Sequence, residues 1–306
     1  MAVTEPGDRL AEPEAIEGFL ATRPQLFGLA YRMLGSVAEA EDVVQEAFLR
    51  WQAVDRAAVK NARAFLVRVV TRLCLDHLKS ARVRREEYVG PWLPEPLVTF
   101  VEEGEEAAFA QDHSTALLLA LERLSPLERA AFLLHDIFEM DFVEIADLLD
   151  RSPAACRQLA VRARSNLRHE KRRFPVPPAE AAAIVAAFNR ASREGDLQAL
   201  RDLLAEDVVL HTDGGGRRAS ALNLLTGWKK VARFYEGLAR KGLISQPVTE
   251  RFAWINGNPG LLTLEKDGLP QSIGLDVRGG RIHAIYVVRN PEKLGHVVLA
   301  PIQGAC

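Results

Sequence analysis

The chain has 306 residues, about twice the length of a typical single domain, so two or three domains are expected. Hydrophobic residues make up 48% of the chain and charged residues 26%, a balance that excludes wholesale disorder. The 39 basic and 41 acidic side chains give a formal net charge of −2, so any affinity for a polyanion must come from individual segments.

The sequence also excludes several classes of protein. No run approaches the roughly 18 apolar residues of a membrane span, and residues 1–6 lack the basic-then-apolar order of a signal peptide. We therefore expect a cytoplasmic protein without a membrane partner. Cys74, Cys156 and Cys306 are too few and too widely spaced for a disulfide framework or a cysteine zinc site. We expect no metal and no cofactor.

An acidic amphipathic helix is the first clear element. Ser36 and Glu39 have the spacing of a capping box, which predicts the start of the helix. Helical periodicity then places apolar side chains on one face (Val43, Val44, Ala47, Phe48 and Trp51) and acidic or amide side chains on the other (Glu39, Glu41, Asp42, Gln45 and Glu46).

A polar connector, residues 55–61, separates this helix from a long basic helix that begins near Arg63. Residues 60–85 contain eight basic side chains against Asp76 alone, a net charge of +7. Such a concentration of positive charge favours contact with a phosphate backbone, whereas a solvated helix face is the alternative interpretation. We call this segment the first basic stripe.

The helical period is lost from Pro91 to about Asp112. Residues 91–115 contain six acidic side chains and no basic one, which indicates a linker. Its start, Trp92-Leu93-Pro94-Glu95-Pro96, is too apolar for an idle spacer, so we expect this part to dock on a neighbour or partner.

Three further helices are predicted after the linker. The first begins at Ser125-Pro126 and runs to about Phe138, the second spans roughly Phe142 to Leu149, and the third runs from Ser152-Pro153 to about Arg172. Residues 151–173 again have a net charge of +7, the second basic stripe. The pattern is typical of a helix-turn-helix whose last helix enters the DNA major groove, with an ordinary three-helix bundle as the alternative.

After the boundary at residues 175–178, the predicted secondary structure changes from helices alone to helices followed by strands. One or two helices are predicted between Ala179 and Ala205, followed by strands at residues 208–212, 252–255, 261–265, 272–277 and 281–288. Asn256-Gly257 and Gly279-Gly280 are typical of hairpin turns. The pattern predicts an α+β domain with an antiparallel sheet.

Together these motifs resemble the extracytoplasmic-function (ECF) sigma factors of RNA polymerase. The resemblance covers roughly residues 20–172 and rests on Ala40–Trp51, Ala64–Leu66 with Asp76, Ser125–Arg129, Glu144–Ala146 and Ala154–Leu167. The segments Trp92–Pro96, Asp213–Arg217 and Asn290–Leu294 look like those of the SigJ-type subgroup, which has a C-terminal SnoaL-like extension of the cone-shaped, nuclear-transport-factor-like fold.

The resemblance implies partners for each helical segment. The acidic helix would dock on core RNA polymerase through Glu41, Asp42, Gln45 and Glu46. The connector and the first basic stripe would hold a flipped base and the melted promoter strand through Lys60, Asn61, Arg63, Arg68, Arg72, Lys79, Arg82, Arg84 and Arg85. The second stripe would bind the minus-thirty-five element as duplex DNA through Ala154, Ala155, Arg157, Gln158, Arg162, Arg164 and Arg168.

The SnoaL-like extension is expected to regulate these activities. The acidic linker either follows a basic channel of the polymerase or folds onto the third domain. Regulatory contacts between domains are expected at Trp92, Leu93, Pro94, Asp213, Gly214, Gly215, Gly216, Asn290, Pro291, Lys293 and Leu294.

A pocket in the cone fold could also hold a small ligand or support acid–base chemistry. The candidate groups are Asp207, His211, Asp213 and Asp276, with Tyr235 and Tyr286 as donors. The sequence shows no convergent pair among them, so no catalytic residue is assigned and the protein is not expected to be an enzyme.

The predicted fold is multidomain: two all-α helical sigma domains, the second with a helix-turn-helix, followed by an α+β cone-shaped SnoaL-like domain. The predicted boundaries are residues 15–90 for sigma domain 2, 91–112 for the linker, 113–174 for sigma domain 4 and 179–300 for the SnoaL-like domain. The predicted function is a sigma factor that binds core RNA polymerase and directs it to specific promoters, with its activity modulated by the third domain. Two alternatives stay open: a classical helix-turn-helix regulator that uses the second stripe alone, and a cone-fold isomerase or hydrolase with attached helical domains.

Overall fold

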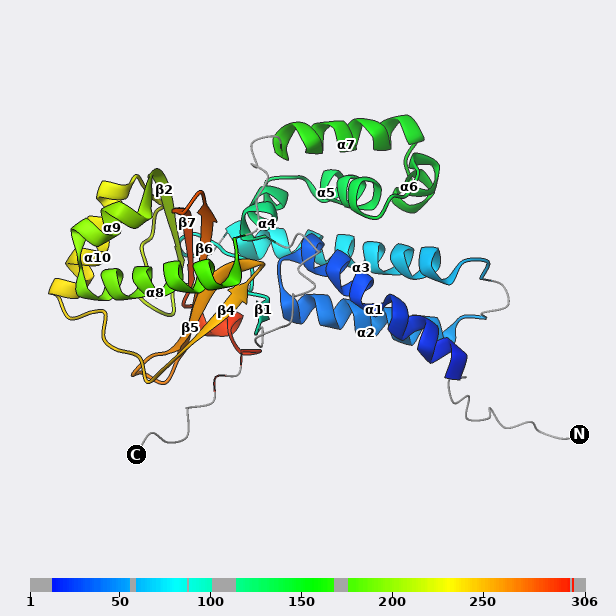
Figure 1. The fold of residues 1–306 in the computed structure, drawn as a ribbon. Coiled ribbons are helices and arrows are strands. Elements are labelled where there is room, and N and C mark those ends of the chain that lie inside the picture. The colour runs from blue at the N-terminus through cyan, green and yellow to red at the C-terminus, as the bar shows by residue number, and fades with distance from the viewer. Residues whose placement is uncertain are drawn as a thin grey trace, which may run out of the picture. The chain divides into compact units, whose positions relative to one another are not determined.

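The structure, a computed structural model, describes residues 13–55, 59–86, 88–100, 114–167, 176–297 and 299. The chain divides into two compact units (Figure 1): a helical unit, Met1–Ala81 with Leu124–Ser165, and a C-terminal unit, Arg82–Arg123 with Asn166–Cys306. Within the described ranges, no helix is both long and apolar enough to cross a membrane.

The helical unit begins with three helices, α1 (Pro13–Leu34), α2 (Val37–Ala53) and α3 (Ala62–Glu86). α2 begins as predicted, because the Ser36 hydroxyl accepts a hydrogen bond from the Glu39 amide at 3.1 Å. α3 begins where the Asn61 side-chain oxygen accepts from the Ala64 amide at 3.0 Å. Both helix starts therefore follow from local capping.

The rest of the helical unit contains α5 (Pro126–Phe132), the π-helical turn η2 (Leu133–Ile137), α6 (Phe142–Leu149) and α7 (Pro153–Leu167). Ser125 and Glu128 form the predicted capping box at the start of α5. The buried Arg129 guanidinium donates to the Met33 carbonyl and so joins α5 to the end of α1, and burial lowers the pKa of Arg129 to about 10. The predicted end of α7 near Arg172 lies outside the described residues.

The described part of the C-terminal unit contains a seven-stranded sheet with the order β1-β4-β5-β6-β7-β2-β3. The strands are β1 (Val98–Thr99), β2 (Leu204–Asp213), β3 (Leu225–Thr226), β4 (Thr249–Ile255), β5 (Asn258–Leu264), β6 (Pro270–Arg278) and β7 (Arg281–Val288). Helices α8 (Pro178–Glu194), α9 (Leu197–Leu203) and α10 (Trp228–Arg240) complete this α+β arrangement. The two predicted hairpin turns are confirmed, since Asn256, Gly257, Gly279 and Gly280 all have positive φ at two-residue connections.

Some features of the sheet differ from the prediction. The sequence predicted an antiparallel sheet, but β2 pairs with β7 in parallel, with His211 opposite Tyr286. α10 was not predicted, although Val231, Ala232 and Tyr235 are buried at helical spacing. β1 was not predicted either, because its partner β4 lies far away in the sequence.

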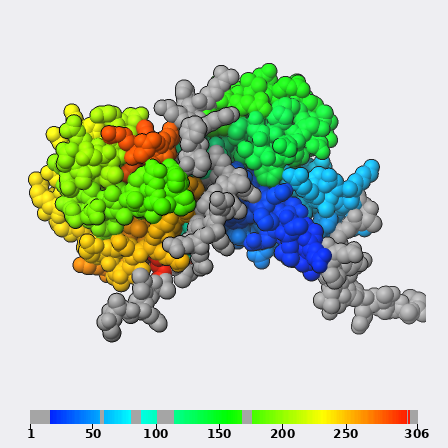
Figure 2. Space-filling view, viewed as in Figure 1, coloured from blue at the N-terminus to red at the C-terminus, as the bar shows by residue number. Residues whose placement is uncertain are grey.

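The two faces of the sheet are covered differently. Side chains alternate along each strand, so Leu210, Leu275 and Ile285 point to an inner-face cluster that includes Phe188 of α8 and Tyr235 of α10. In the space-filling view, α8 lies across the surface of the C-terminal unit (Figure 2). The opposite, outer face carries Ala284, Tyr286 and Val288.

The outer face is covered by segments from before and after the sheet. Residues 88–100, α4 (Thr115–Glu122) and the short 3₁₀ helix η3 (Pro291–Lys293) all belong to the C-terminal unit. Leu93 and Leu294 are fully buried in one cluster with the outer-face side chains, and Leu119 of α4 packs against that cluster. Of the two courses expected for the linker, residues 88–100 therefore fold onto the third domain, whereas residues 101–112 lie outside the described residues.

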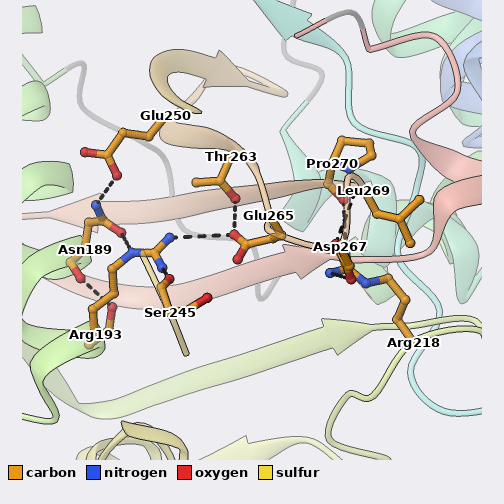
Figure 3. A network of polar contacts seen from close by, with 11 residues as sticks. Asn189, Arg193, Arg218, Ser245, Glu250, Thr263, Glu265, Asp267, Leu269 and Pro270 are labelled. Atoms are coloured by element: carbon orange, nitrogen blue, oxygen red, sulfur yellow. Dashed lines mark hydrogen bonds and ion pairs between the residues drawn. The ribbon is translucent and has the colours of Figure 1, made fainter. Parts of the chain in front are cut away.

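A polar network ties α8 to the strands at the end of β5 (Figure 3). Arg193 of α8 donates to the Ser245 carbonyl and lies 3.7 Å from the Glu265 carboxylate, which accepts from the Thr263 hydroxyl at 2.6 Å. The side chains of Arg193 and Glu265 are only 7% and 14% exposed. The two charges compensate each other, so this ion pair can lie partly buried at the end of β5.

Candidate functional site

The first basic stripe lies on α3 and the residues before it. One side of α3 is buried through Leu66, Val70, Cys74 and Leu78. The predicted DNA contacts Lys60, Asn61, Arg63, Arg68, Arg72 and Lys79 are exposed, as the prediction requires. The Lys79 ammonium forms an ion pair with the Asp76 carboxylate at 2.7 Å. The side chains of Arg82, Arg84 and Arg85 lie outside the described part of the chain.

The second basic stripe lies on the last helix of a helix-turn-helix. Asp150 has φ of 54° in the turn after α6, and the Ser152 hydroxyl accepts from the Ala155 amide at 3.2 Å at the start of α7. Cys156, Leu159, Ala160, Ala163 and Leu167 form the buried side of α7. The predicted contacts Ala154, Arg157, Gln158 and Arg162 are exposed, Ala155 and Arg164 are half-buried, and Arg168 lies outside the described residues.

Two of these arginines make ion pairs within the helical unit. Arg162 lies 2.9 Å from Glu128, and Arg164 lies 2.8 Å from Asp136. The arginine side chains remain 60% and 39% exposed. The Glu128 and Asp136 side chains are only 16% and 25% exposed, so a DNA phosphate that took over either arginine would leave a partly buried carboxylate without its partner.

Two of the predicted polymerase contacts, Glu41 and Gln45, line a groove between α1 and α2. Glu41 pairs with Arg23, Glu46 pairs with Arg50 at 2.8 Å, and Asp42 and Gln45 are exposed. The groove has a volume of about 310 Å³ and is lined by Ile16, Phe19, Leu20, Arg23, Glu41, Val44, Gln45 and Phe48. The sequence had indicated only the acidic part of this surface, because Leu20 and Phe48 are as consistent with a core position as with a groove.

The outer face of the C-terminal unit holds the linker through one buried carboxylate. Asp213 accepts hydrogen bonds from the Leu93 amide at 2.8 Å, the Tyr88 hydroxyl at 2.6 Å and the Gly215 amide at 3.0 Å. The Lys293 ammonium lies 2.7 Å from the same carboxylate and also donates to the Leu93 carbonyl. We call Asp213, Lys293, Tyr88 and Asn290, with the backbone of Leu93, the linker clasp.

Aromatic rings complete the surroundings of the Lys293 ammonium. It lies 4.6 Å from the centre of the Tyr88 ring and 4.3 Å from that of Trp92, distances typical of cation–π contacts. The Asn290 amide donates to the Tyr88 hydroxyl at 2.9 Å, and its oxygen caps η3 by accepting from the Glu292 amide. Burial, reinforced by Asp213, raises the pKa of Tyr88, so its hydroxyl stays a donor.

The structure thus brings together the three segments that the sequence singled out for regulation. Pro94 is buried beside Leu93, Pro291 begins η3, and Gly214, Gly215 and Gly216 form the tight loop after Asp213. A Cβ on Gly214 would lie 2.1 Å from the Arg218 carbonyl oxygen, so this loop excludes side chains. Sequence reasoning missed Tyr88, and also Asn256 and His296, which bind the linker backbone farther along.

The candidate acid–base groups do not converge on one site. Tyr235 belongs to the inner core, whereas the rings of His211 and Tyr286 meet on adjacent strands, with their centres 5.2 Å apart and their planes tilted by 37°. Asp213 is held by the clasp, Asp276 pairs with Arg278, and Asp207 is 78% exposed beside His283. Burial lowers the pKa of His211 to about 4, with a smaller contribution from Arg123.

Comparisons with known proteins identify the family. A model of Sigma-70 region 2 matches residues 19–84, and a model of Sigma-70 region 4 matches residues 114–167. The ECF RNA polymerase sigma factor SigJ of Mycobacterium tuberculosis is 38% identical over 292 residues, which cover 91% of this chain and 92% of SigJ. The chain belongs to the ECF RNA polymerase sigma factors.

The similarity of this sigma factor to its relatives extends through the C-terminal domain. The probable ECF RNA polymerase sigma factor SigI of M. tuberculosis is 33% identical over 284 residues, 90% of this chain and 92% of SigI. The crystal structure of M. tuberculosis SigJ matches with a TM-score of 0.73 at 37% identity, covering 92% of this chain and 98% of that chain.

These findings confirm the predicted family, the fold class of helical sigma regions followed by an α+β domain, and the function of a transcription initiation factor. Sigma factors act with core RNA polymerase at promoter DNA and are not enzymes, so the isomerase or hydrolase alternative is set aside. The roles of individual residues stay predictions.

Proposed function

We propose that this sigma factor binds core RNA polymerase through α2, contacts promoter DNA through the two basic stripes, and is modulated by its C-terminal domain through the linker clasp. The exposed acidic side chains of α2, Asp42 among them, would meet the polymerase. The stripe on α3 would hold the melted strand, and α7 would enter the major groove of the minus-thirty-five element.

The exposure of both basic stripes supports the DNA contacts. The described basic residues from Lys60 to Lys79 are exposed, and the side chains of Arg162 and Arg164 stay 60% and 39% exposed although each is paired with a carboxylate. Each stripe alone would bind weakly. Joint engagement, at a distance set by the polymerase, would supply the affinity and the promoter selectivity.

The observation that carries the regulatory proposal is the buried ion pair between Asp213 and Lys293 at the backbone of Leu93. The linker connects the segments that match Sigma-70 regions 2 and 4, so a domain that holds the linker restricts how both regions can move. Removal of one member of a buried pair leaves an uncompensated charge and costs about 3–5 kcal/mol. Loss of the clasp would therefore weaken the hold on the linker.

Run-off transcription with purified core RNA polymerase tests the proposal. Lys293→Met should change the yield of promoter-dependent transcript at least threefold. Glu292→Gln is the matched control, because Glu292 is the preceding residue in η3 and its side chain is 66% exposed in a surface pair with Arg217. A Lys293→Met protein that melts normally and transcribes like the control would contradict the regulatory role.

Charge reversal of the first stripe tests the DNA contacts separately. Arg68→Glu with Arg72→Glu should abolish open-complex formation, because the melted strand would lose its cationic surface. A classical helix-turn-helix regulator would keep its operator affinity after this change. Retained promoter opening by the double variant would therefore refute the role proposed for α3.

A further inference from the structure

The outer face of the C-terminal domain has the properties of a peptide-binding groove. Residues 88–100 contain no helix and run along this face, and their last part forms β1 at the edge of the sheet. Val98 pairs with Ile255 and Thr99 with Trp254 in an antiparallel ladder with β4. Addition of a strand to an open sheet edge is a general mode of peptide recognition.

The domain binds the backbone of the linker at several points besides this ladder. The Leu93 amide donates to the Asp213 carboxylate, and the Leu93 carbonyl accepts from the Lys293 ammonium. The Pro96 carbonyl accepts from the His296 ring at 2.8 Å. The Leu97 backbone amide donates to the Asn256 side-chain oxygen at 3.2 Å. The Leu97 carbonyl accepts from the Asn256 backbone amide at 2.8 Å.

The prolines of the linker suit this arrangement. Pro94 and Pro96 are both buried but have no N–H group, so neither leaves a buried donor without a partner. Each proline also restricts the residue before it to extended conformations, which lowers the entropy lost on binding. The segment is therefore pre-organised as a ligand for the groove.

Apolar side chains of the linker are buried at two places along this face. Leu93 is fully buried against Ala284, Tyr286 and Val288. Val98 and Phe100 pack against a separate apolar cluster on the outer face. The Arg251 guanidinium lies 3.8 Å from the centre of the Phe100 ring. The linker's apolar side chains pack into the clusters of the domain while its main chain is held by hydrogen bonds, the division typical of peptide receptors.

We propose that this groove is a binding site for an extended, proline-interrupted apolar peptide, and that the linker is its exchangeable occupant. The inference rests on the proposed regulation and deepens it: a segment of the same pattern on another polypeptide would release the linker by taking its place. The linker itself competes from the same chain at an effective concentration on the order of millimolar, so the wild-type groove resists a free peptide.

The experiment therefore uses a full-length chain whose own linker binds poorly. Leu93→Asp places a carboxylate in the apolar pocket and should vacate it, and Leu93→Ala is a milder variant that serves if the first fails to fold. The probe is a fluorescein-labelled synthetic peptide with the sequence of residues 88–100, and its binding is followed by anisotropy. The control peptide carries the same Leu93→Asp change.

The vacated chain should bind the wild-type peptide at least tenfold more tightly than the wild-type chain does, and the control peptide at least tenfold more weakly. A vacated chain with normal circular dichroism and melting that binds no peptide, or binds both peptides equally, would overturn the inference. Run-off transcription by the same variants separates the two proposals. Altered transcription without peptide binding would refute only the exchangeable site, and peptide binding with unaltered transcription would refute only the regulation.

Discussion

Gly215 shows how a single residue sets the geometry of the clasp. Its φ is +58°, and an added Cβ would lie 2.3 Å from the Asn290 side-chain nitrogen that donates to Tyr88. Gly215→Ala should lower the free energy of unfolding of the C-terminal unit by about 2–4 kcal/mol, since both backbone strain and displacement of Asn290 contribute. Gly242→Ala is the matched control, because Gly242 has φ of +63° with nothing within 4 Å of the added Cβ. Equal losses in urea titrations of the two variants would show that contact with Asn290 is unimportant.

His211 makes the stability of the C-terminal unit depend on pH. Its pKa is lowered from 6.5 to about 4, chiefly by burial, so the folded state keeps the ring neutral where the unfolded state binds a proton. The free energy of unfolding therefore keeps its full value above pH 6.5. It falls progressively as the pH drops towards 4, by at most ~3 kcal/mol, because the unfolded state gains a proton that the folded state does not bind. His211→Gln should therefore lose less stability between pH 7 and pH 4.5 than the wild type does.

Urea titrations in a Trp51→Phe background report on this unit, because Trp92, Trp228 and Trp254 all belong to it. The matched substitution is His283→Gln, at a second histidine of the sheet, whose side chain is 30% exposed.

At the scale of the element, α7 should contribute to DNA affinity mainly through charge. Arg164→Gln should reduce the slope of log K against log salt concentration by about one, because one fewer phosphate would be neutralised. The measurement is binding of the holoenzyme to a labelled minus-thirty-five duplex at several salt concentrations. Arg240→Gln, an exposed position at the end of α10, is the control and should leave the slope unchanged. An unchanged slope for Arg164→Gln would remove this arginine from the proposed interface.

A local start signal made several helices predictable, but it was neither sufficient nor necessary: α4 begins at the Ser114 cap and was missed, whereas α8 has no side-chain cap and was predicted. The hydroxyls of Ser125 and Ser152 mark the starts of α5 and α7. α10 follows Gly227, whose φ is 92° and which has no side chain to cap the helix, so the usual polar signal is missing. Only the spacing of its buried side chains could have revealed it.

The clasp depends on pairings that no local pattern encodes. The resemblance to a known family pointed to the linker, the loop after β2 and η3 as functional segments. Hydrogen bonds between Leu93 and Asp213, 120 positions apart, or between Tyr88 and Asp213, 125 positions apart, arise only once the sheet has formed. Tyr88 was missed for this reason, since an isolated tyrosine before the linker carries no signal of its own.

At the scale of the whole molecule, the compact units and the family matches divide the chain differently. Sigma-70 region 4 matches residues 114–167, but α4 belongs to the C-terminal unit, and the helical unit resumes only at Leu124. Leu119 of α4 packs against the outer-face cluster that also buries Leu93. The C-terminal domain thus holds the described part of the linker together with the first helix of the region 4 match.

This division predicts which amides respond when the clasp is broken. In the full chain, the amides of Leu93 and Leu97 donate to Asp213 and Asn256, so they should exchange with solvent deuterium slowly and at similar rates, as parts of one cooperative unit. Lys293→Met leaves Asp213 buried without its cation, which should accelerate exchange of both amides at least tenfold.

The amides of Ala160 and Ala163, on the buried side of α7 in the helical unit, are the internal control and should exchange at their wild-type rates. Acceleration at Leu93 without acceleration at Leu97 would show that the clasp and the β1 ladder open independently, whereas acceleration in α7 as well would show that the two units unfold together.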